Sequence, residues 1–237
     1  MVATAAQKSM AEQLLLDLPL RAALGREDFL VAPSNEAAVR VVDEWPKWPT
    51  HGAILVGPAG CGKSHLAHVW QSRSRAEVVA AATTTKEALP SLFANRALCL
   101  EDIEVGQFEE TMMFHALNLA RQEGAHVLLS SRLEPALWQV KLPDLASRLK
   151  ALPVVHILPP DDALLRAVLV KQFADRQIVV DEALIGYMVL RMPRSAAAAR
   201  ALVGEIDRQA MVEKAEITRP FVAKVMARVQ SPELFTT

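Results

Sequence analysis

The sequence has only two cysteines among its 237 residues, Cys61 and Cys99. Two cysteines are too few for the disulfide framework of a small secreted domain, so we interpret both as reduced thiols, with a redox switch at Cys61 as the alternative. No apolar run approaches the roughly 18 residues of a membrane-spanning helix. The N-terminus also lacks the basic segment and unbroken apolar core of a signal peptide. These absences predict a cytoplasmic protein without a membrane segment.

Net charge is nearly absent as well, because 26 Lys and Arg residues face 27 Asp and Glu residues and leave a net charge of −1. Binding to nucleic acid relies largely on Lys and Arg side chains that neutralise phosphates. The composition therefore argues against tight DNA binding by the chain alone, although a sum over the whole chain leaves a local basic patch open.

What the sequence does contain is a nucleotide-binding motif directly after the apolar run 53–56. The pattern G-x-x-x-x-G-K-[ST] is filled by Gly57-Pro58-Ala59-Gly60-Cys61-Gly62-Lys63-Ser64. In such a P-loop the glycines let backbone N–H groups turn toward phosphate oxygens, and the helix that follows points its positive end at the same anion. Lys63 would reach the β- and γ-phosphates and Ser64 would bind Mg²⁺. The alternative is a glycine-rich turn that binds nothing.

We expect ADP or ATP to contact this loop from Pro58 through Ser64, and His65 directly after it. His65 and His68 are three positions apart on the predicted helix, a spacing that some metal sites use, but no further His or Cys completes a ligand set. We therefore interpret the pair as helix-face residues and expect the nucleotide and Mg²⁺ as the cofactors. No Ser-His-Asp or Cys-His arrangement indicates hydrolysis of another kind.

Apolar runs alternate with helical segments over roughly the first 160 residues. Five runs are predicted strands, at residues 53–56, 77–81, 97–100, 127–132 and 154–157. Apolar strands that alternate with helices predict an α/β fold, with a five-stranded parallel sheet between helices. Helices are expected at 108–122 and 144–149, and another at 37–42, where Ser34 or Asn35 can cap it.

Beyond Pro159-Pro160 the sequence is helical throughout. Asp161 and Asp181 can cap two helices, a third is expected at 194–216, and Thr218 with Pro220 can start a fourth. We therefore expect a flexible leader at residues 1–23, an α/β nucleotide-binding domain at 24–159 and a helical lid domain at 160–237.

Two carboxylates, Glu101 and Asp102, end the predicted third strand. Ligands of open α/β sheets bind at the carboxyl ends of the strands, so Glu101 is expected to hold the water shell of Mg²⁺ and Asp102 to orient the attacking water. Such strands usually carry Asp first, and the reversed order would weaken the Mg²⁺ geometry and slow hydrolysis. The alternative is a pair of acids that face water. Ser130, at the end of the next strand, could contact the γ-phosphate or the attacking water.

Two arginines could also act on a nucleotide. Arg148 lies in the predicted short helix 144–149, from which it could project to the γ-phosphate of a neighbouring chain, and such an arginine finger can raise a rate by roughly 10³–10⁵. Its alternative is an ordinary surface ion pair. Arg194, at the start of the third helix of the lid, could reach back over the phosphates and report the nucleotide state by domain closure.

Taken in order, these elements resemble the AAA+ ATPase module of the bacterial replication initiator DnaA. The matching parts are the P-loop extended to His65-Leu66, the acidic strand end, Leu128-Leu129-Ser130-Ser131 as sensor 1, Leu145-Ala146-Ser147-Arg148-Leu149 as the arginine-finger box and Arg194 as sensor 2. The resemblance covers about residues 24–229. The chain stops at Thr237, which is expected to leave no room for the helix-turn-helix domain of DnaA.

The leader carries the other departure from DnaA. A glutamine followed by spaced leucines is similar to the sliding-clamp-binding peptide of Hda-type regulatory inactivators of DnaA, and is made here by Gln13, Leu14, Leu16, Leu18 and Pro19. The alternative is a leader that packs on its own domain.

The resemblance to Hda-type proteins implies a function. The leader would bind the DNA-loaded sliding clamp, and Arg148 would stimulate ATP hydrolysis by DnaA, which prevents re-initiation of replication. DNA would be contacted only through the clamp, the chain's own hydrolysis would be weak, and a homo-oligomer is open. Two other classes remain: a helicase loader or DnaA-like ATPase that binds single-stranded DNA, and a small-molecule kinase, for which Arg148 and the lid would be surplus.

Overall fold

The structure, a computed structural model, describes residues 29–230. Its centre is a five-stranded parallel sheet, as the alternating pattern predicts. The strand order in the sheet is β2-β3-β4-β1-β5. The strands are β1 Gly52–Val56, β2 Glu77–Ala80, β3 Ala97–Ile103, β4 His126–Ser131 and β5 Val154–His156. The five residues of the leader peptide expected to bind the clamp lie outside the described residues.

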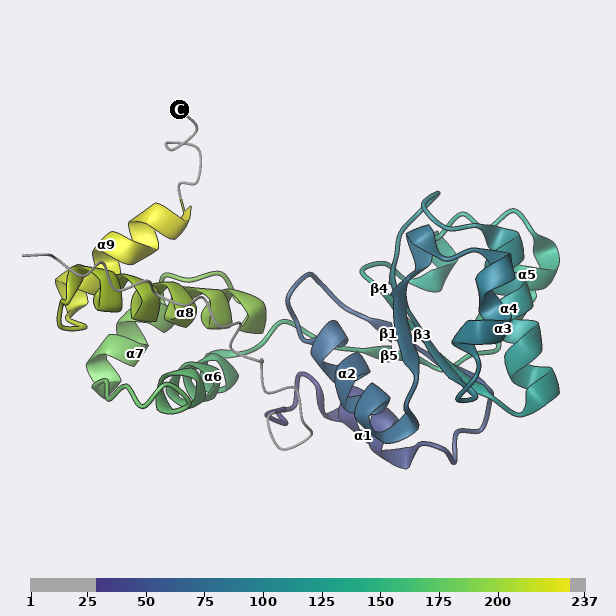
Figure 1. Cartoon of the computed structure of the whole chain (residues 1–237), viewed down its shortest axis with the longest axis horizontal. Helices are drawn as coiled ribbons and strands as arrows, with labels where there is room; N and C mark the ends of the chain where they lie inside the picture. Colours follow the sequence, from purple (N-terminus) through teal and green to yellow (C-terminus); the bar gives the residue numbers. More distant parts are fainter. Residues whose placement is uncertain (1–28, 231–237) are drawn as a thin grey trace, which may run out of the picture.

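The strands read as continuous apolar runs because the sheet is covered on both faces. The helices α1 and α2 cover one face and α3 to α5 the other (Figure 1). Their bounds are α1 Glu36–Glu44, α2 Lys63–Ser74, α3 Leu89–Leu92, α4 Glu110–Glu123 and α5 Pro143–Lys150. Three short 3-10 turns occupy Ala81–Thr83, Lys86–Ala88 and Pro135–Leu137.

Each face of the sheet has its own core. Leu98 and Leu100 of β3 point into the core under α4, whereas Cys99 between them points into the core under α2. The alternation of successive side chains along a strand produces this split. It also determines which strand-end residues can face the P-loop, since the P-loop leads into α2.

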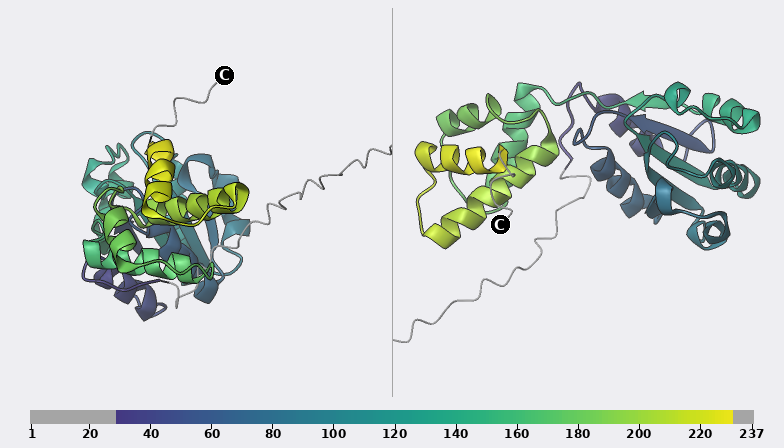
Figure 2. Two further views of the ribbon diagram at one scale, coloured as in Figure 1. Left: turned by 90° about the vertical axis from the view of Figure 1, so that its left-hand side faces the viewer. Right: turned by 90° about the horizontal axis from the view of Figure 1, so that it is seen from above.

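Four helices follow the sheet and gather at the other end of the molecule (Figures 1 and 2). They are α6 Asp162–Ala174, α7 Glu182–Val189, α8 Ala196–Glu213 and α9 Arg219–Gln230. Their buried side chains, from Leu165 to Met226, form a separate core. Asp161 and Asp181 accept hydrogen bonds from the backbone N–H groups of Leu164 and Leu184, so both predicted caps are present.

Three local features differ from the expectations. The strand β3 continues through the acidic pair to Ile103, with an irregular register after Leu100. Asn35 precedes α1, but its side chain bonds to the backbone of Leu30 and Ala32 and not to the helix. The third lid helix begins at Ala196 with Ser195 as its cap, two residues later than expected. None of the helices in residues 29–230 is long and apolar enough to cross a membrane.

Candidate functional site

The P-loop connects β1 to α2 and takes a backbone path that only glycine adopts readily. Gly60 and Gly62 have φ angles of 72° and 116°, in the left-handed region. The side chain of Lys63, only 6% exposed, folds back over this loop. Its Nζ donates hydrogen bonds to the carbonyl oxygens of Gly57 (2.7 Å) and Pro58 (2.9 Å). A buried ammonium group thus stands beside the backbone that would receive a phosphate.

The tip of the P-loop touches the start of α8. The backbone N–H of Ala196 donates to the carbonyl oxygen of Gly60 at 3.1 Å, and the hydroxyl of Ser195 donates to the same oxygen at 3.3 Å. A Cβ atom on Gly60 would lie 2.0 Å from the Oγ of Ser195. The P-loop glycine is therefore required by its neighbour as well as by its own backbone angle.

A small cleft of about 50 Å³ lies beside the P-loop, between α2 and the helices α6 and α8. Its wall includes Gly62 and His65 from the P-loop side and Leu164 and Arg200 from the helical side. The Nη1 of Arg200 lies 3.3 Å from the Nδ1 of His65, and burial lowers the pKa of the Arg200 guanidinium. Within residues 29–230 no carboxylate pairs with Arg200.

The two arginines of α8 and its cap region have different surroundings. Arg194 forms an exposed ion pair with Asp162 at the start of α6, 2.9 Å long, and does not line the cleft. Arg200, which sequence reasoning missed, does line it. The available signal was periodic: Ala196 and Arg200 are four residues apart, so both lie on the helix face that meets the P-loop.

The acidic pair at the end of β3 is split between two environments. Glu101 continues the alternation of Cys99 and lies on the α2 face, where its Oε1 is buried with no hydrogen-bond partner among the described residues. Burial, with the Glu101 charge as a smaller effect, holds the pKa of the Cys99 thiol well above its usual range. Asp102 is exposed and has a φ of 52°. Of the two carboxylates, only Glu101 has a buried oxygen that lacks a partner among the described residues, which is a costly arrangement for a charged group.

The adjacent serines at the end of β4 also differ. Ser130 is buried on the α2 face, and its Oγ accepts a single hydrogen bond, from the backbone N–H of Asp102 at 3.3 Å. Ser131 faces the other core, where its Oγ bonds to Ile103, Leu133 and Trp138. The structure therefore brings Ser130 to the same face as Glu101 and the P-loop helix, whereas Ser131 holds loops together.

The remaining nucleotide-loop residues are placed as follows. Ser64 is exposed in the first turn of α2, where its carbonyl oxygen accepts a hydrogen bond from His68. Pro58 and Ala59 are exposed at the bend of the loop. Cys61 is buried, and burial raises the pKa of its thiol against the opposing effect of the Lys63 charge. A protonated thiol reacts slowly with oxidants, which disfavours the redox alternative.

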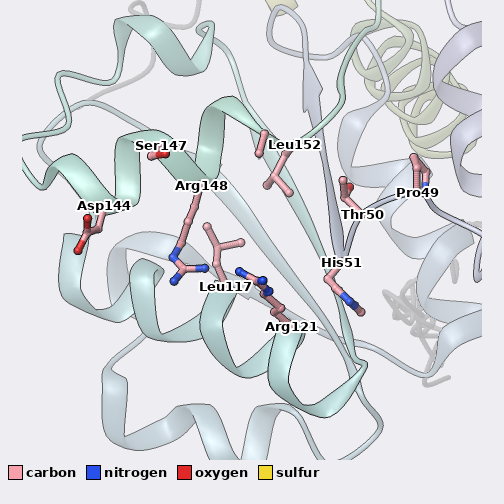
Figure 3. A pocket seen from close by; sticks show the side chains of 10 residues that line it. Pro49, Thr50, His51, Leu117, Arg121, Asp144, Ser147, Arg148 and Leu152 are labelled. Carbon is pink, nitrogen blue, oxygen red and sulfur yellow. The ribbon is translucent and has the colours of Figure 1, made fainter.

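Arg148 is far from all of these residues. It lies in the last turn of α5, just before β5 begins, and thus at the amino ends of the strands, whereas the P-loop follows the carboxyl end of β1. Its guanidinium carbon sits 4.9 Å from the ring centre of Phe114 on α4. It also lines an open groove of about 550 Å³ (Figure 3).

Solved structures with the same arrangement include DnaA and RuvB proteins. No family model matches the sequence, and no curated protein matches it either. Domain III of the replication initiation protein DnaA from Thermotoga maritima superposes with a TM-score of 0.72 and 18% identity, over 88% of this chain and 98% of that one. The chain has the AAA+ fold.

Two longer proteins show the same module within a larger chain. AMPPCP-bound DnaA from Aquifex aeolicus has a TM-score of 0.66 at 17% identity, over 87% of this chain and 68% of its own. The RuvB Holliday junction branch migration motor of Thermotoga maritima has a TM-score of 0.67 at 15% identity, over 86% and 71%. At these identities the AAA+ likeness shows the fold and not the activity.

Proposed function

We propose that this AAA+ chain binds an adenine nucleotide, ADP or ATP, with Mg²⁺ at the P-loop. The residues fit both groups: Lys63 and the left-handed glycines form an anion cradle, and the unpartnered oxygen of Glu101 suits a cation shell that Ser64 would complete. When bound, Mg²⁺ would neutralise phosphate charge. Ser130 and Asp102 would contact the terminal phosphate side, as proposed from the sequence.

Entry of a nucleotide into the cleft requires the helices α6 and α8 to move. The cleft between α2 and α8 measures about 50 Å³, whereas ligand sites usually hold several hundred Å³. Because α6 and α8 form one wall, they must shift away from the P-loop when a nucleotide binds. The position of α8 would then depend on whether a nucleotide is bound.

The observation that carries the rest of the proposal is the position of Arg148. It stands at the amino edge of the sheet, and the chain's own P-loop stands at the carboxyl edge, so Arg148 cannot serve its own nucleotide. An arginine finger can act on the nucleotide of a neighbouring molecule. We propose that this neighbour is ATP-bound DnaA, whose hydrolysis Arg148 stimulates, and that the initiator is thereby converted to an inactive ADP form that cannot restart replication.

The leader supplies the second contact in this proposal. Gln13 and Leu16 would anchor the chain to the sliding clamp on DNA, so that DNA itself is met only through the clamp. Linking the chain to a loaded clamp would raise its effective concentration near replicating DNA. The support for this step is the sequence pattern alone.

The test is phosphate release by ATP-bound DnaA with the chain and the clamp on DNA. We expect stimulation by the natural chain, loss of most of it in Arg148→Ala, and full stimulation by Arg40→Ala, which alters an exposed arginine on α1 that pairs with Glu36. Unchanged stimulation by Arg148→Ala would remove the finger assignment. Clamp binding that survives replacement of Gln13 and Leu16 by Ala would remove the leader assignment.

A further inference from the structure

Arg148 does not stand alone in its groove. Arg121, in the last turn of α4, extends toward it from the opposite wall, and Leu117 forms the floor between them (Figure 3). The groove continues past Thr50 and His51 just before β1. Two guanidinium groups from different helices therefore converge on one concave surface.

This convergence has no counter-charge. Within residues 29–230 no carboxylate lies within 4.0 Å of the charged nitrogens of Arg121 or of Arg148. Asp144 lines the far rim of the groove and points away from both guanidinium groups (Figure 3). Each arginine complements the negative end of its own helix, but that effect does not require the two cations to face each other. Like charges held together favour a shared anion of high charge.

The position of the groove in the fold indicates which molecule supplies that anion. The chain's own P-loop is at the opposite edge of the sheet, so the anion belongs to a second molecule. Guanidinium groups grip phosphate oxygens in a bidentate manner, and two of them suit adjacent phosphates. We propose that Arg121 and Arg148 together bind the terminal phosphates of a nucleotide held by a neighbouring AAA+ chain. This inference rests on the proposed function and adds Arg121 as a second phosphate-binding residue.

The first test separates phosphate contact from simple docking. DnaA hydrolysis is measured against increasing concentrations of the natural chain, Arg121→Ala, Arg121→Lys and the control Arg40→Ala. A contact with the reacting phosphates predicts that Arg121→Ala lowers the maximal rate by about 10–100-fold, with partial recovery in Arg121→Lys. A variant that only raises the half-saturating concentration, at an unchanged maximal rate, would show that Arg121 binds protein groups and would overturn the proposal.

The second test does not depend on DnaA. The full chain is saturated with ADP, treated with the arginine reagent phenylglyoxal with and without inorganic tripolyphosphate, and mapped by mass spectrometry. We expect tripolyphosphate to protect Arg121 and Arg148 over the same concentration range and to leave Arg40 unprotected. Protection of Arg148 alone, or equal protection of Arg40, would overturn the inference. If both arginines are protected but DnaA is not stimulated, the groove assignment stands and the choice of DnaA as partner fails.

Discussion

The hydroxyl of Ser195 donates a hydrogen bond to the carbonyl oxygen of Gly60, a residue 135 positions away in the chain. The backbone N–H of Ala196 donates to the same oxygen. The two donors are the N-cap and the first residue of α8, at the positive end of the helix dipole. The bend of the P-loop is thus hydrogen-bonded directly to the start of α8. A substitution at either side of this contact should change the position of the other side.

Replacing Gly60 with Ala tests this link. The new methyl group would overlap the Ser195 Oγ at 2.0 Å, so the loop or α8 must shift, and we expect ADP affinity to fall at least about tenfold, which corresponds to roughly 1.4 kcal/mol. Gly106→Ala is the matched control, because Gly106 has a φ of 71° and no neighbour within 4 Å. Both variants carry backbone strain of about 1–2 kcal/mol, and only the first carries the overlap. Titration with a fluorescent ADP analogue measures the effect; equal affinity losses in the two variants would rule out the link.

The two arginines near α8 should differ in their effect on nucleotide binding. Arg200→Met removes a half-buried cation from the cleft, and a lost charge-assisted hydrogen bond would weaken ADP binding about 10–100-fold. Arg194→Met breaks only an exposed ion pair with Asp162, which is worth at most about 1 kcal/mol of stability. Calorimetric ADP titration compares them. A larger loss in Arg194→Met would support the assignment of Arg194 to the nucleotide site that the sequence predicts.

Glu101→Gln should uncouple nucleotide binding from Mg²⁺. The substitution preserves shape and removes the charge of the buried, unpartnered carboxylate. We expect ADP affinity in EDTA to stay the same, and the increase caused by Mg²⁺ to disappear. Asp102→Asn is the control, because Asp102 is exposed and Asn tolerates its positive φ. An unchanged Mg²⁺ response in Glu101→Gln would exclude Glu101 from the cation shell.

His126 predicts a pH dependence of stability. Burial, and to a smaller extent the neighbouring His51, lowers the pKa of the His126 imidazole below its ordinary value of 6.5. The unfolded chain therefore takes up this proton before the folded chain does, and the free energy of unfolding should fall as the pH drops below about 6.5. Urea unfolding at pH 5.5 and 7.5 measures the change. His126→Gln should reduce the difference between the two pH values, and an unaltered difference would contradict the assignment.

Much of the fold could be predicted because its signals are local. Apolar runs such as Ala53–Val56 are long enough for buried strands, and Asp161 and Asp181 are strong helix caps. The P-loop is equally local, since its glycines and Lys63 lie within eight residues. Each of these features depends on neighbours along the chain.

The features that the sequence did not reveal depend on contacts between distant segments. The contact of Arg200 with His65 forms only when α8 meets α2. The four-residue spacing of Arg200 from Ala196 indicates its helix face but not its partner on α2. The same holds for Arg121, which lies in the predicted helix 108–122 and comes near Arg148 only because α4 and α5 pack side by side. The sequence predicts similar surroundings for Glu101 and Asp102, but the structure buries an oxygen of Glu101 and exposes Asp102, in a stretch of irregular register after Leu100.

Because Arg148 and the P-loop lie at opposite edges of the sheet, the two ends of the α/β domain are chemically different. One end carries the P-loop and the other carries Arg121 and Arg148, so two modules that engaged as proposed would meet head-to-tail through unlike surfaces. Contacts of this kind are heterologous: they extend into rings or open filaments unless an end stays uncovered. If a chain contacted an initiator through Arg121 and Arg148, and its own P-loop end contacted no further subunit, the assembly could not extend beyond it.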